Sequence, residues 1–441
     1  MSSHTIAVEG WGRWRSATVE RRSPTTTDEL SRMQLPEADL IPRGLGRSYG
    51  DAAQRSAGTV VDTTACDNVY WVDRGAGVVR CDAGVSIGSL IDRFAPKGWF
   101  VPVSPGTRHV TVGGAIAADI HGKNHHIDGS FGDHVRRMRL RLADNTVVDL
   151  SPTSNKDLFW ATVGGMGLTG IVIDADLALT PIATTQIAVE TSRLSTLNEL
   201  MATMRSSDRH HRFSVAWVDL LGGARSVLTQ GSFATPAQVA SNAAGPLRRP
   251  RTPALNLPPM PPMRFVRTPG VRAFNELWWR RAPAEPTVTN ESITAFFHPL
   301  DAIRDWPRLY GSTGFVQWQC VVPDDQGDAL LAVCDRLGSM PAYFTVLKRF
   351  GASNAGPLSF PMPGWTLAVD LPAIDTALES LHRLDEMVVE AGGRIYLAKD
   401  ARMRREVFEI SYPRLDEWKS VRRAVDPGRR FASDLSHRLG L

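Results

Sequence analysis

Apolar residues in the first part of the chain fall into short runs separated by turn-forming residues. Such runs predict three short strands, at residues 59–62, 69–73 and 78–82. Apolar side chains then recur at helical spacing between Ile87 and Phe94, which predicts one amphipathic helix there. The chain is therefore expected to begin as a mixture of strands and helix.

A clear period of two comes next. Between residues 137 and 142, three apolar side chains alternate with three arginines, which predicts a strand with one apolar and one polar face. Asp144 and Asn145 would turn the chain back into a strand at 147–150. A helix at 157–163 and a strand at 171–179 would complete one α+β unit that ends near residue 184.

A second unit follows, with its own pattern. Apolar residues between Leu197 and Met204 lie on one helix face, and a strand is expected at 213–219. Later runs predict an antiparallel sheet, with strands at 315–322, 343–350 and 366–371. A helix at 374–391 would cover this sheet, with Ala377, Leu378, Leu381, Leu384 and Val388 on its inner face. The tail from Arg394 would add a strand and at least one helix.

Residues 245–270 are dense in proline and interrupt the second unit. Proline lacks an amide hydrogen and fixes one backbone angle, so we expect a long loop or mobile flap here. The complete pattern predicts an α+β fold with two domains. Residues 1–184, completed by 394–441, would form one domain, and residues 185–393 the other.

Bulk charge and cysteine content exclude several classes of protein. The 441 residues hold 50 basic and 46 acidic side chains, so the net charge of +4 does not indicate a nucleic-acid partner. The four cysteines, at 66, 81, 320 and 334, show no C-x-x-C spacing and no disulfide framework, which favours a reducing compartment. The N-terminus lacks the apolar core of a signal peptide, and no apolar run reaches the ~20 residues of a membrane span. We expect a cytoplasmic protein or one at the periphery of a membrane.

The segment from Pro105 to His126 carries the most specific chemistry. Gly113 and Gly114 allow close backbone approach, and successive amide groups in such turns can bind an anion. Three alanines follow and would let the segment pack against something flat. We therefore expect a flavin dinucleotide here, with its pyrophosphate against the backbone and its ring near His121.

Three other motifs compete with this interpretation. Residues 46–50 match the G-x-S-x-G nucleophile elbow, but Pro42 interrupts the strand that the elbow needs. Residues 165–170 match G-x-G-x-x-G, yet the helix precedes the strand, the reverse of the order in a Rossmann fold. His121, His125 and His126 lack a nearby carboxylate or cysteine, so we predict polar loop histidines and no metal.

Taken together, the chain resembles the vanillyl-alcohol-oxidase-type FAD enzymes, and within them the group that oxidises decaprenylphosphoryl-β-D-ribose during bacterial arabinan synthesis. The stretches that carry the resemblance are PRGLGRSYGD (42–51), PGTRHVTVGGAIAADIHGKNHH (105–126), DLFWATVGGMGLTGI (157–171), FFHPLD (296–301), PLSFPMPGW (357–365), IYLAKD (395–400) and YPRLDEW (412–418). The resemblance implies that the first domain binds FAD and that the second binds substrate.

The resemblance also implies a set of site residues. Those that would hold FAD are Arg43, Gly44, Leu45, Gly46, Arg47, Ser48, Tyr49, Gly50, Asp51, Gly106, Thr111, Gly113, Gly114, Ala118, Ile120, His121, Val172, Tyr396 and Lys399. The substrate would be bounded by Tyr49, His121, Tyr310, Gln317, Lys348, Phe350 and Lys399. Many relatives attach the flavin covalently through a histidine, and Arg47 stands at that position here, so the FAD is expected to be non-covalent. Some relatives carry a cysteine where this chain has Ala368, so thiol-directed chemistry is not expected there.

The implied reaction is oxidation of the ribose 2'-hydroxyl of decaprenylphosphoryl-β-D-ribose to a ketone, which a separate NADH-dependent reductase would convert to the arabinose epimer. We assign Lys399 to stabilising the reduced flavin, and His121, or else Tyr49 or Lys399, to accepting the hydroxyl proton. The lipid-linked substrate implies a membrane surface, which Trp278, Trp279, Arg280 and Arg281 would contact. Two alternatives stay open, namely an FAD-dependent alditol or sugar-lactone oxidase and a non-catalytic phosphate-binding protein.

Overall fold

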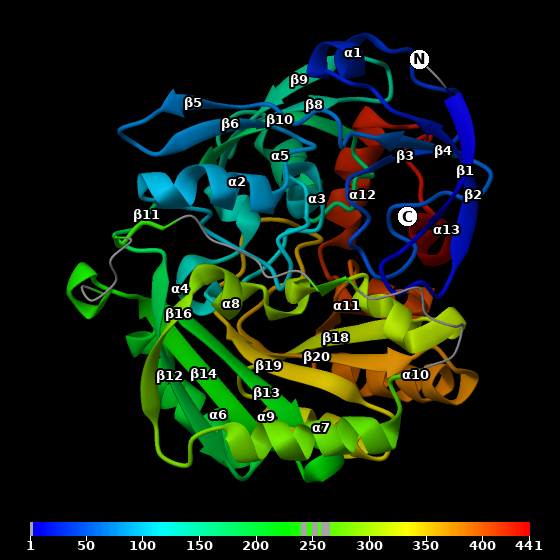
Figure 1. Cartoon of the computed structure of the whole chain (residues 1–441). Helices are drawn as coiled ribbons and strands as arrows, with labels where there is room; N and C mark the ends of the chain where they lie inside the picture. The colour runs from blue at the N-terminus through cyan, green and yellow to red at the C-terminus, as the bar shows by residue number, and fades with distance from the viewer. Residues whose placement is uncertain (1–2, 240–244, 249–254, 257–264) are drawn as a thin grey trace.

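The computed structural model describes residues 3–239, 245–248, 255–256 and 265–441. Two layers meet face to face, with smaller sheets in the upper half of Figure 1 and one large sheet in the lower half. The site described below lies between these layers. The fold is therefore α+β, with mixed helices and mainly antiparallel sheets, as the sequence predicts.

Two sheets form the upper layer. The four-stranded sheet has the order β1-β2-β4-β3 and contains β1 (Ser3–Glu9), β2 (Ser16–Arg22), β3 (Leu40–Arg43) and β4 (Thr59–Asp62). The five-stranded sheet has the order β5-β6-β10-β8-β9 and contains β5 (Val69–Asp73), β6 (Val78–Asp82), β8 (Val135–Arg141), β9 (Val147–Leu150) and β10 (Ile171–Ala178). The predicted strands at 59–62, 69–73, 78–82 and 147–150 are confirmed with unchanged bounds.

The polar face of β8 differs from the prediction at Arg141. Arg137 and Arg139 pair with the carboxylates of Asp149 and Asp174, as polar-face residues would. Arg141 instead is fully buried, and its guanidinium donates to the carbonyl oxygens of the segment that ends helix α1 (Thr27–Arg32). The alternation of apolar and polar residues in β8 cannot show that the end of helix α1 covers Arg141 on the polar face of the strand.

The lower layer is an eight-stranded antiparallel sheet with the order β16-β12-β14-β13-β19-β20-β18-β21. Its strands are β12 (Gln186–Leu194), β13 (Phe213–Asp219), β14 (Arg225–Phe233), β16 (Thr287–Ser292), β18 (Phe315–Pro323), β19 (Tyr343–Phe350), β20 (Gly364–Pro372) and β21 (Arg394–Ile395). The predicted antiparallel sheet is confirmed. β19, which carries Lys348, lies in its interior, between β13 and β20.

Helices separate the site from solvent on both sides. Helices α6 (Leu197–Ser207), α9 (Gly327–Gly338) and α10 (Asp375–Glu390) cover the far face of the eight-stranded sheet. In α10, the predicted inner residues are buried, except that Leu378 is half-buried. Helices α3 (Val112–Ala117), α5 (Lys156–Thr162) and α8 (Ile293–Phe297) contribute residues to the cavity wall. Helices α2 (Ile87–Phe94) and α4 (His125–Asp128) contribute none. The short strands β7 (Trp99–Phe100) and β11 (Thr180–Pro181) pair with each other.

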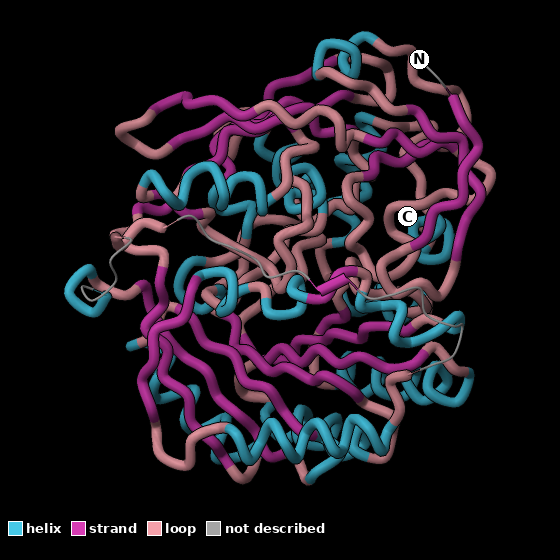
Figure 2. The backbone as a smooth tube through the Cα atoms, viewed as in Figure 1, coloured by secondary structure: helices cyan, strands magenta, loops and turns pink. Residues whose placement is uncertain are grey.

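The C-terminal segment contacts both layers. Strand β21 extends the eight-stranded sheet, after which α11 (Arg405–Ser411), α12 (Leu415–Val425) and α13 (Asp434–Leu439) follow. Helix α12 packs against α5, and Arg438 of α13 pairs with Asp51 at 2.8 Å. Figure 2 shows the strands of the large sheet in the lower half of the molecule, with helices along its far side. The predicted division at residues 184 and 394 stays a prediction, because no finding tests it.

Most of the proline-dense stretch lies outside the described residues. Its described part differs from the prediction at two places. Residues 255–256 form strand β15 (Leu255–Asn256), parallel to β17 (Ile303–Arg304). Helix α7 (Thr268–Arg281) begins before residue 270, with Pro269 in its first turn, where the missing amide hydrogen costs no helical bond. No helix of the described ranges is both long and apolar enough to cross a bilayer.

Candidate functional site

A cavity of about 630 Å³ lies between the two layers. Most of the residues predicted to bind cofactor or substrate line this cavity. They are Arg43, Gly44, Leu45, Gly46, Arg47, Ser48, Tyr49, Gly106, Thr111, Gly113, Gly114, Ala118, Ile120, His121, Val172, Gln317, Lys348, Tyr396 and Lys399. The upper layer contributes loops and the lower layer contributes strand side chains. The sequence therefore brings these segments, far apart along the chain, to one place.

Four predicted site residues do not line the cavity. Gly50 and Asp51 lie behind its wall: a Cβ at Gly50 would be 2.0 Å from the carbonyl oxygen of Asp400, and Asp51 is ion-paired with Arg438. Tyr310 is fully buried and stacks on Phe315, with ring centroids 4.4 Å apart. Phe350 packs behind His121 at 4.7 Å. Adjacency in sequence could not reveal which way these groups point.

The glycine segments form the wall expected to face a diphosphate. Gly44 lies so close to Thr111 that a Cβ would be 2.2 Å from its hydroxyl, and Gly46 has the positive φ of 64°. Gly113 and Gly114 lie inside helix α3, capped by Thr111, so the expected turn is a helical one. Its amides already have partners, because Gly113 N–H donates to the carbonyl of Ala83 at 2.9 Å and Gly114 N–H donates to the Thr111 hydroxyl at 3.2 Å. Beside Gly106 no atom lies within 4 Å of a Cβ position, which leaves room for a ligand.

The second glycine motif is a close-approach turn of the same wall. Helix α5 precedes it and strand β10 follows it, which confirms that the order is not that of a Rossmann fold. Met166, Gly167 and Gly170 all have positive φ angles and line the cavity. The wall also holds an unpartnered polar atom, because Arg47 Nε is buried and has no hydrogen-bond partner among the described residues. Open backbone and an unused guanidinium hydrogen suit the phosphates of FAD.

The hydrogen bonds around His121 determine its tautomer. The hydroxyl of Thr366 donates to the carbonyl of Cys320 at 2.8 Å, so it accepts from Gln319. The same Gln319 nitrogen is 3.0 Å from His121 Nε2, which therefore accepts. The ring proton is left on Nδ1, 3.1 Å from Lys348 Nζ. When Lys348 is neutral, its amine can accept this hydrogen.

Charged groups in the cavity are shifted toward their neutral forms. Loss of hydration and then the charges of Lys399 and Lys123 together lower the pKa of Lys348 to about 7. Loss of hydration also lowers the pKa of Lys399 to about 7, against the opposing effect of Asp370. His121 has its pKa lowered well below the usual value by burial and then by Lys348. The two lysines can therefore exchange protons near neutral pH, while His121 stays neutral there.

Asp370 is a cavity residue that sequence reasoning missed. It lies on β20, and Gln317 donates to its Oδ1 at 2.6 Å. Burial raises its pKa to about 7, although the hydrogen bond from Gln317 and the charge of Lys399 oppose the shift. The available signal was the period of two, since Asp370 shares a face with Ala368, which was singled out. Trp217, Phe274 and Trp278 also line the cavity and were not predicted to do so.

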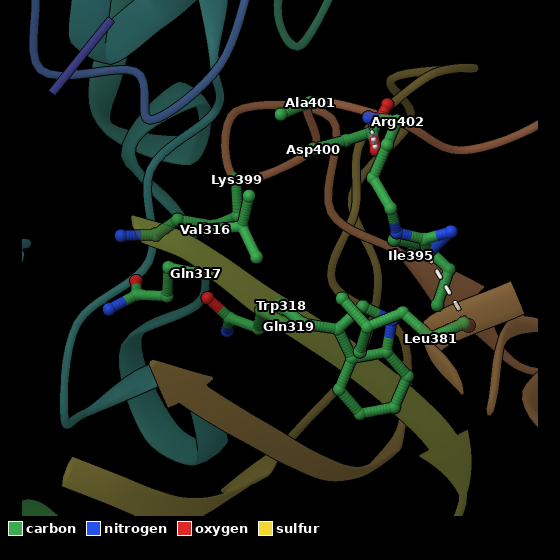
Figure 3. Close-up of a pocket in the computed structure, with 10 residues that line it drawn as sticks. All are labelled: Val316, Gln317, Trp318, Gln319, Leu381, Ile395, Lys399, Asp400, Ala401 and Arg402. Atoms are coloured by element: carbon green, nitrogen blue, oxygen red, sulfur yellow. Dashed lines mark hydrogen bonds between the residues drawn. The ribbon is translucent and has the colours of Figure 1, made fainter. Parts of the chain in front are cut away.

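Figure 3 shows how β18 positions its side chains. Gln317 and Gln319 project to one side and Trp318 to the other. The indole of Trp318 donates to Asp385 of α10 at 2.8 Å, which fixes the strand against the helix. Lys399 lies over the Tyr49 ring, with Nζ 3.8 Å from its centroid. Within the described ranges, no group of three or more His, Cys, Asp or Glu side chains could hold a metal ion.

Comparison with known proteins gives the family. Residues 24–151 match the family described as FAD binding domain. A decaprenylphosphoryl-beta-D-ribose oxidase of Mycolicibacterium smegmatis is 40% identical over 99% of this chain and 98% of its own length. An uncharacterized protein in the mprA 5' region of Streptomyces coelicolor is 40% identical over 81% of this chain and 100% of its own. A Delta(24)-sterol reductase of Rattus norvegicus is 32% identical, over 26% of this chain and 22% of its own.

The long match extends through both layers, so it includes the glycine wall and the strands that face it. The shorter match to the sterol reductase covers only part of the chain. The chain therefore belongs to the family of vanillyl-alcohol-oxidase-type flavoproteins that includes the decaprenylphosphoryl-beta-D-ribose oxidase, and it is an FAD-dependent oxidoreductase.

Proposed function

We propose that this protein oxidises the ribose 2'-hydroxyl of decaprenylphosphoryl-β-D-ribose to the 2'-ketone, the first half of an epimerisation to arabinose for cell-wall arabinan. The 40% identity to an oxidase of this name over nearly the full length of both chains carries the proposal. A separate NADH-dependent reductase would complete the epimerisation.

The side chains at the sheet face of the cavity suit a sugar. FAD, when bound, supplies the two-electron acceptor. Lys348 and Gln317 provide N–H donors for hydroxyl groups, and Lys399 provides a cation beside Tyr49. The two lysines come from different elements, so a bound ribose would be oriented from two directions. The same cavity is also lined by the apolar side chains of Trp217, Phe274 and Trp278, which suit the start of a polyprenyl chain.

Helix α7 suits a lipid surface better than the sequence alone suggests. Phe274 and Trp278 line the cavity and are also about half exposed, while Leu277 between them is 67% exposed. Trp279, predicted as a contact, is instead partly covered, with Arg193 and Arg225 against its ring. We therefore place the proposed membrane contact at Phe274, Leu277 and Trp278.

Sedimentation with vesicles of anionic lipid tests this contact. The triple variant Phe274→Ser, Leu277→Ser and Trp278→Ser should lose most of the bound fraction, because its apolar surface is removed. The matched variant Trp279→Ser, on the covered side of the same helix, should keep it. Equal sedimentation of both variants would count against the membrane contact.

One spectroscopic experiment tests the proposed reaction. Decaprenylphosphoryl ribose, added without oxygen, should bleach the visible absorbance of the FAD-bound protein. Lys399→Ala should slow this bleaching about 10²-fold or more, because a fixed cation is removed from the reacting region. The exposed Lys156→Ala is the control and should leave the rate unchanged. Bleaching only by unlipidated alditols or sugar lactones would replace the proposed substrate with a free sugar.

A further inference from the structure

We infer that the carboxylate of Asp370 takes the proton of the substrate hydroxyl. This assignment rests on the proposed oxidation of an alcohol, but it names a residue that neither the sequence patterns nor the comparisons identify. Asp370 lies on the interior strand β20, only 2% exposed, with its side chain in the cavity wall. A carboxylate at this depth lacks the water that would otherwise hydrate it.

The hydrogen bonds of Asp370 leave one oxygen available. Gln317 donates to Oδ1 at 2.6 Å, which fixes the orientation of the carboxylate. No other side chain of the described ranges donates a hydrogen bond to Asp370, so Oδ2 keeps its lone pairs for a ligand. The groups that face it are Lys399, whose charge favours the ionised form, and the phenols of Tyr49 and Tyr310.

Two of the other candidate bases, His121 and Lys348, are engaged in hydrogen bonds. His121 accepts at Nε2 from Gln319 and carries its proton on Nδ1. Lys348 uses the lone pair of its neutral amine to accept that Nδ1 hydrogen. Burial and then the nearby Asp370 raise the pKa of Tyr49, so its phenol keeps its proton. Lys399 lies against the Tyr49 ring face and serves better as the cation beside the carboxylate.

The chemistry balances with Asp370 in this role. Oxidation of the carbinol would break its C–H bond, and the FAD held by the cavity wall would supply the acceptor for the hydride and its two electrons. The oxidation also breaks the O–H bond, whose proton passes to Asp370 Oδ2 while the C=O bond of the ketone forms. Water or buffer can take this proton once the product leaves. Burial sets the pKa of Asp370 at about 7, where a general base works near neutral pH.

Infrared titration of the FAD-bound protein tests the assignment without substrate. The wild type should show a C=O stretching band of a protonated carboxyl group that disappears as pH rises through about 7, the pKa of Asp370. Asp370→Asn should lack this band and still bind FAD, because the amide keeps the shape of the side chain. A wild-type spectrum that is unchanged in Asp370→Asn would overturn the assignment.

Rates of flavin reduction give the second readout. Asp370→Asn should reduce its flavin at least about 10²-fold more slowly than the wild type. The wild-type rate should fall as pH drops below about 7, because the carboxylate is then protonated. Gln317→Leu removes a hydrogen bond that lowers this pKa, so it should move the fall to higher pH. An Asp370→Asn variant as fast as the wild type would overturn the assignment.

The two proposals fail in different ways. If decaprenylphosphoryl ribose leaves the wild-type flavin oxidised, the proposed substrate is wrong, and the infrared band alone then decides the assignment of Asp370. If the wild type is reduced and Asp370→Asn is equally fast, the substrate stands and Asp370 is not the base. Asp324→Asn, at a surface ion pair with Arg349, is the matched control for loss of a carboxylate.

Discussion

At the scale of single residues, the cavity works by withholding water from its charged groups. Lys348, Lys399 and Asp370 all have pKa values shifted to about 7, the lysines from above and the aspartate from below. Each shift favours the neutral form, which costs stability but makes proton exchange easy near neutral pH. Such a site gives up some free energy of folding in exchange for reactivity.

Lys348 should therefore destabilise the fold at neutral pH. Its folded-state pKa of about 7 lies below the ~10.4 of an unfolded lysine, so folding releases a proton between these two pH values and must bury the charged amine below them. The loss of stability is fully present below pH 7 and disappears as pH rises from about 7 to 10.4. Lys348→Met should thus raise the free energy of unfolding in urea by about 1–2 kcal/mol at pH 6.5 and by almost nothing at pH 10.5.

Lys156→Met is the control for this measurement, because Lys156 is exposed and should show no such pH dependence. If Lys348→Met raises the free energy of unfolding equally at pH 6.5 and pH 10.5, the increase comes from better packing and not from the lost hydration of the amine.

Two glycines test how tightly the cavity wall is packed. A Cβ at Gly50 would lie 2.0 Å from the Asp400 carbonyl oxygen, so Gly50→Ala should lower the free energy of unfolding by about 1–3 kcal/mol. At Gly106 no atom lies within 4 Å, so Gly106→Ala should change it by less than about 0.5 kcal/mol. Urea unfolding of both variants compares them, and equal losses would contradict this account of the wall.

The site residues were predictable where a motif determines backbone shape, and less so where side-chain direction decides. The glycine segments line the cavity as expected, because their small residues are what close approach requires. Tyr310 and Phe350 came from resemblance alone, and the structure buries them against other rings. Asp370 was missed because a single carboxylate in a strand gives no sequence signal until the opposing layer is known.

At the scale of elements, the loop between β21 and α11 carries Lys399 and is held at two points. Arg402 pairs with Asp385 of α10, both almost fully buried, and Asp400 pairs with Arg438 of α13 at 2.9 Å. The labelled residues of Figure 3 include the first of these arginines beside β18. The position of Lys399 thus depends on ion pairs outside the cavity.

Asp385→Ala should break the first ion pair. It leaves the Arg402 guanidinium buried without its carboxylate, so the free energy of unfolding should fall by about 3–5 kcal/mol. The double variant Asp385→Leu with Arg402→Met should recover most of this loss, because no charge is left buried. Chemical denaturation measures both, and a double variant as unstable as Asp385→Ala would show that the pair is not what matters.

The elements that the sequence predicted share a local signal, and those it missed depend on neighbours. Strands β5, β6, β9, β13 and β19 have the predicted bounds, because turn residues limit their apolar runs. Strand β16 is mostly exposed and polar, so only its pairing with β12 makes it a strand. Helix α3 contains two adjacent glycines and gave no helical signal, although Thr111 caps it well.

At the scale of the whole molecule, FAD would contact both layers at once, because residues from each line one cavity. Binding to the folded state alone should stabilise it, by about 2.7 kcal/mol when free FAD is 100 times its Kd. Thermal unfolding of protein stripped of flavin should therefore shift upward as FAD is added back. A midpoint that does not respond to FAD would contradict a cofactor site between the layers.

The same preparation tests how FAD is held. Arg47, whose guanidinium lies 4.0 Å from the centroid of the Trp11 ring, replaces the histidine that forms a covalent bond in many relatives. Acid precipitation should therefore release all of the yellow colour into the supernatant. Colour that stays with the pellet would show a covalent bond.

The path of the chain from β21 through Lys399 to α11 has one mechanical consequence. It pairs with the large sheet through β21 at one end, and at the other end α11 contacts α10 and α13. If the two layers separate far enough to admit or release a dinucleotide, the segment from β21 through Lys399 to α11 must move with them. Binding of FAD would therefore be coupled to the positioning of Lys399, so the enzyme without FAD would also lack a correctly placed Lys399.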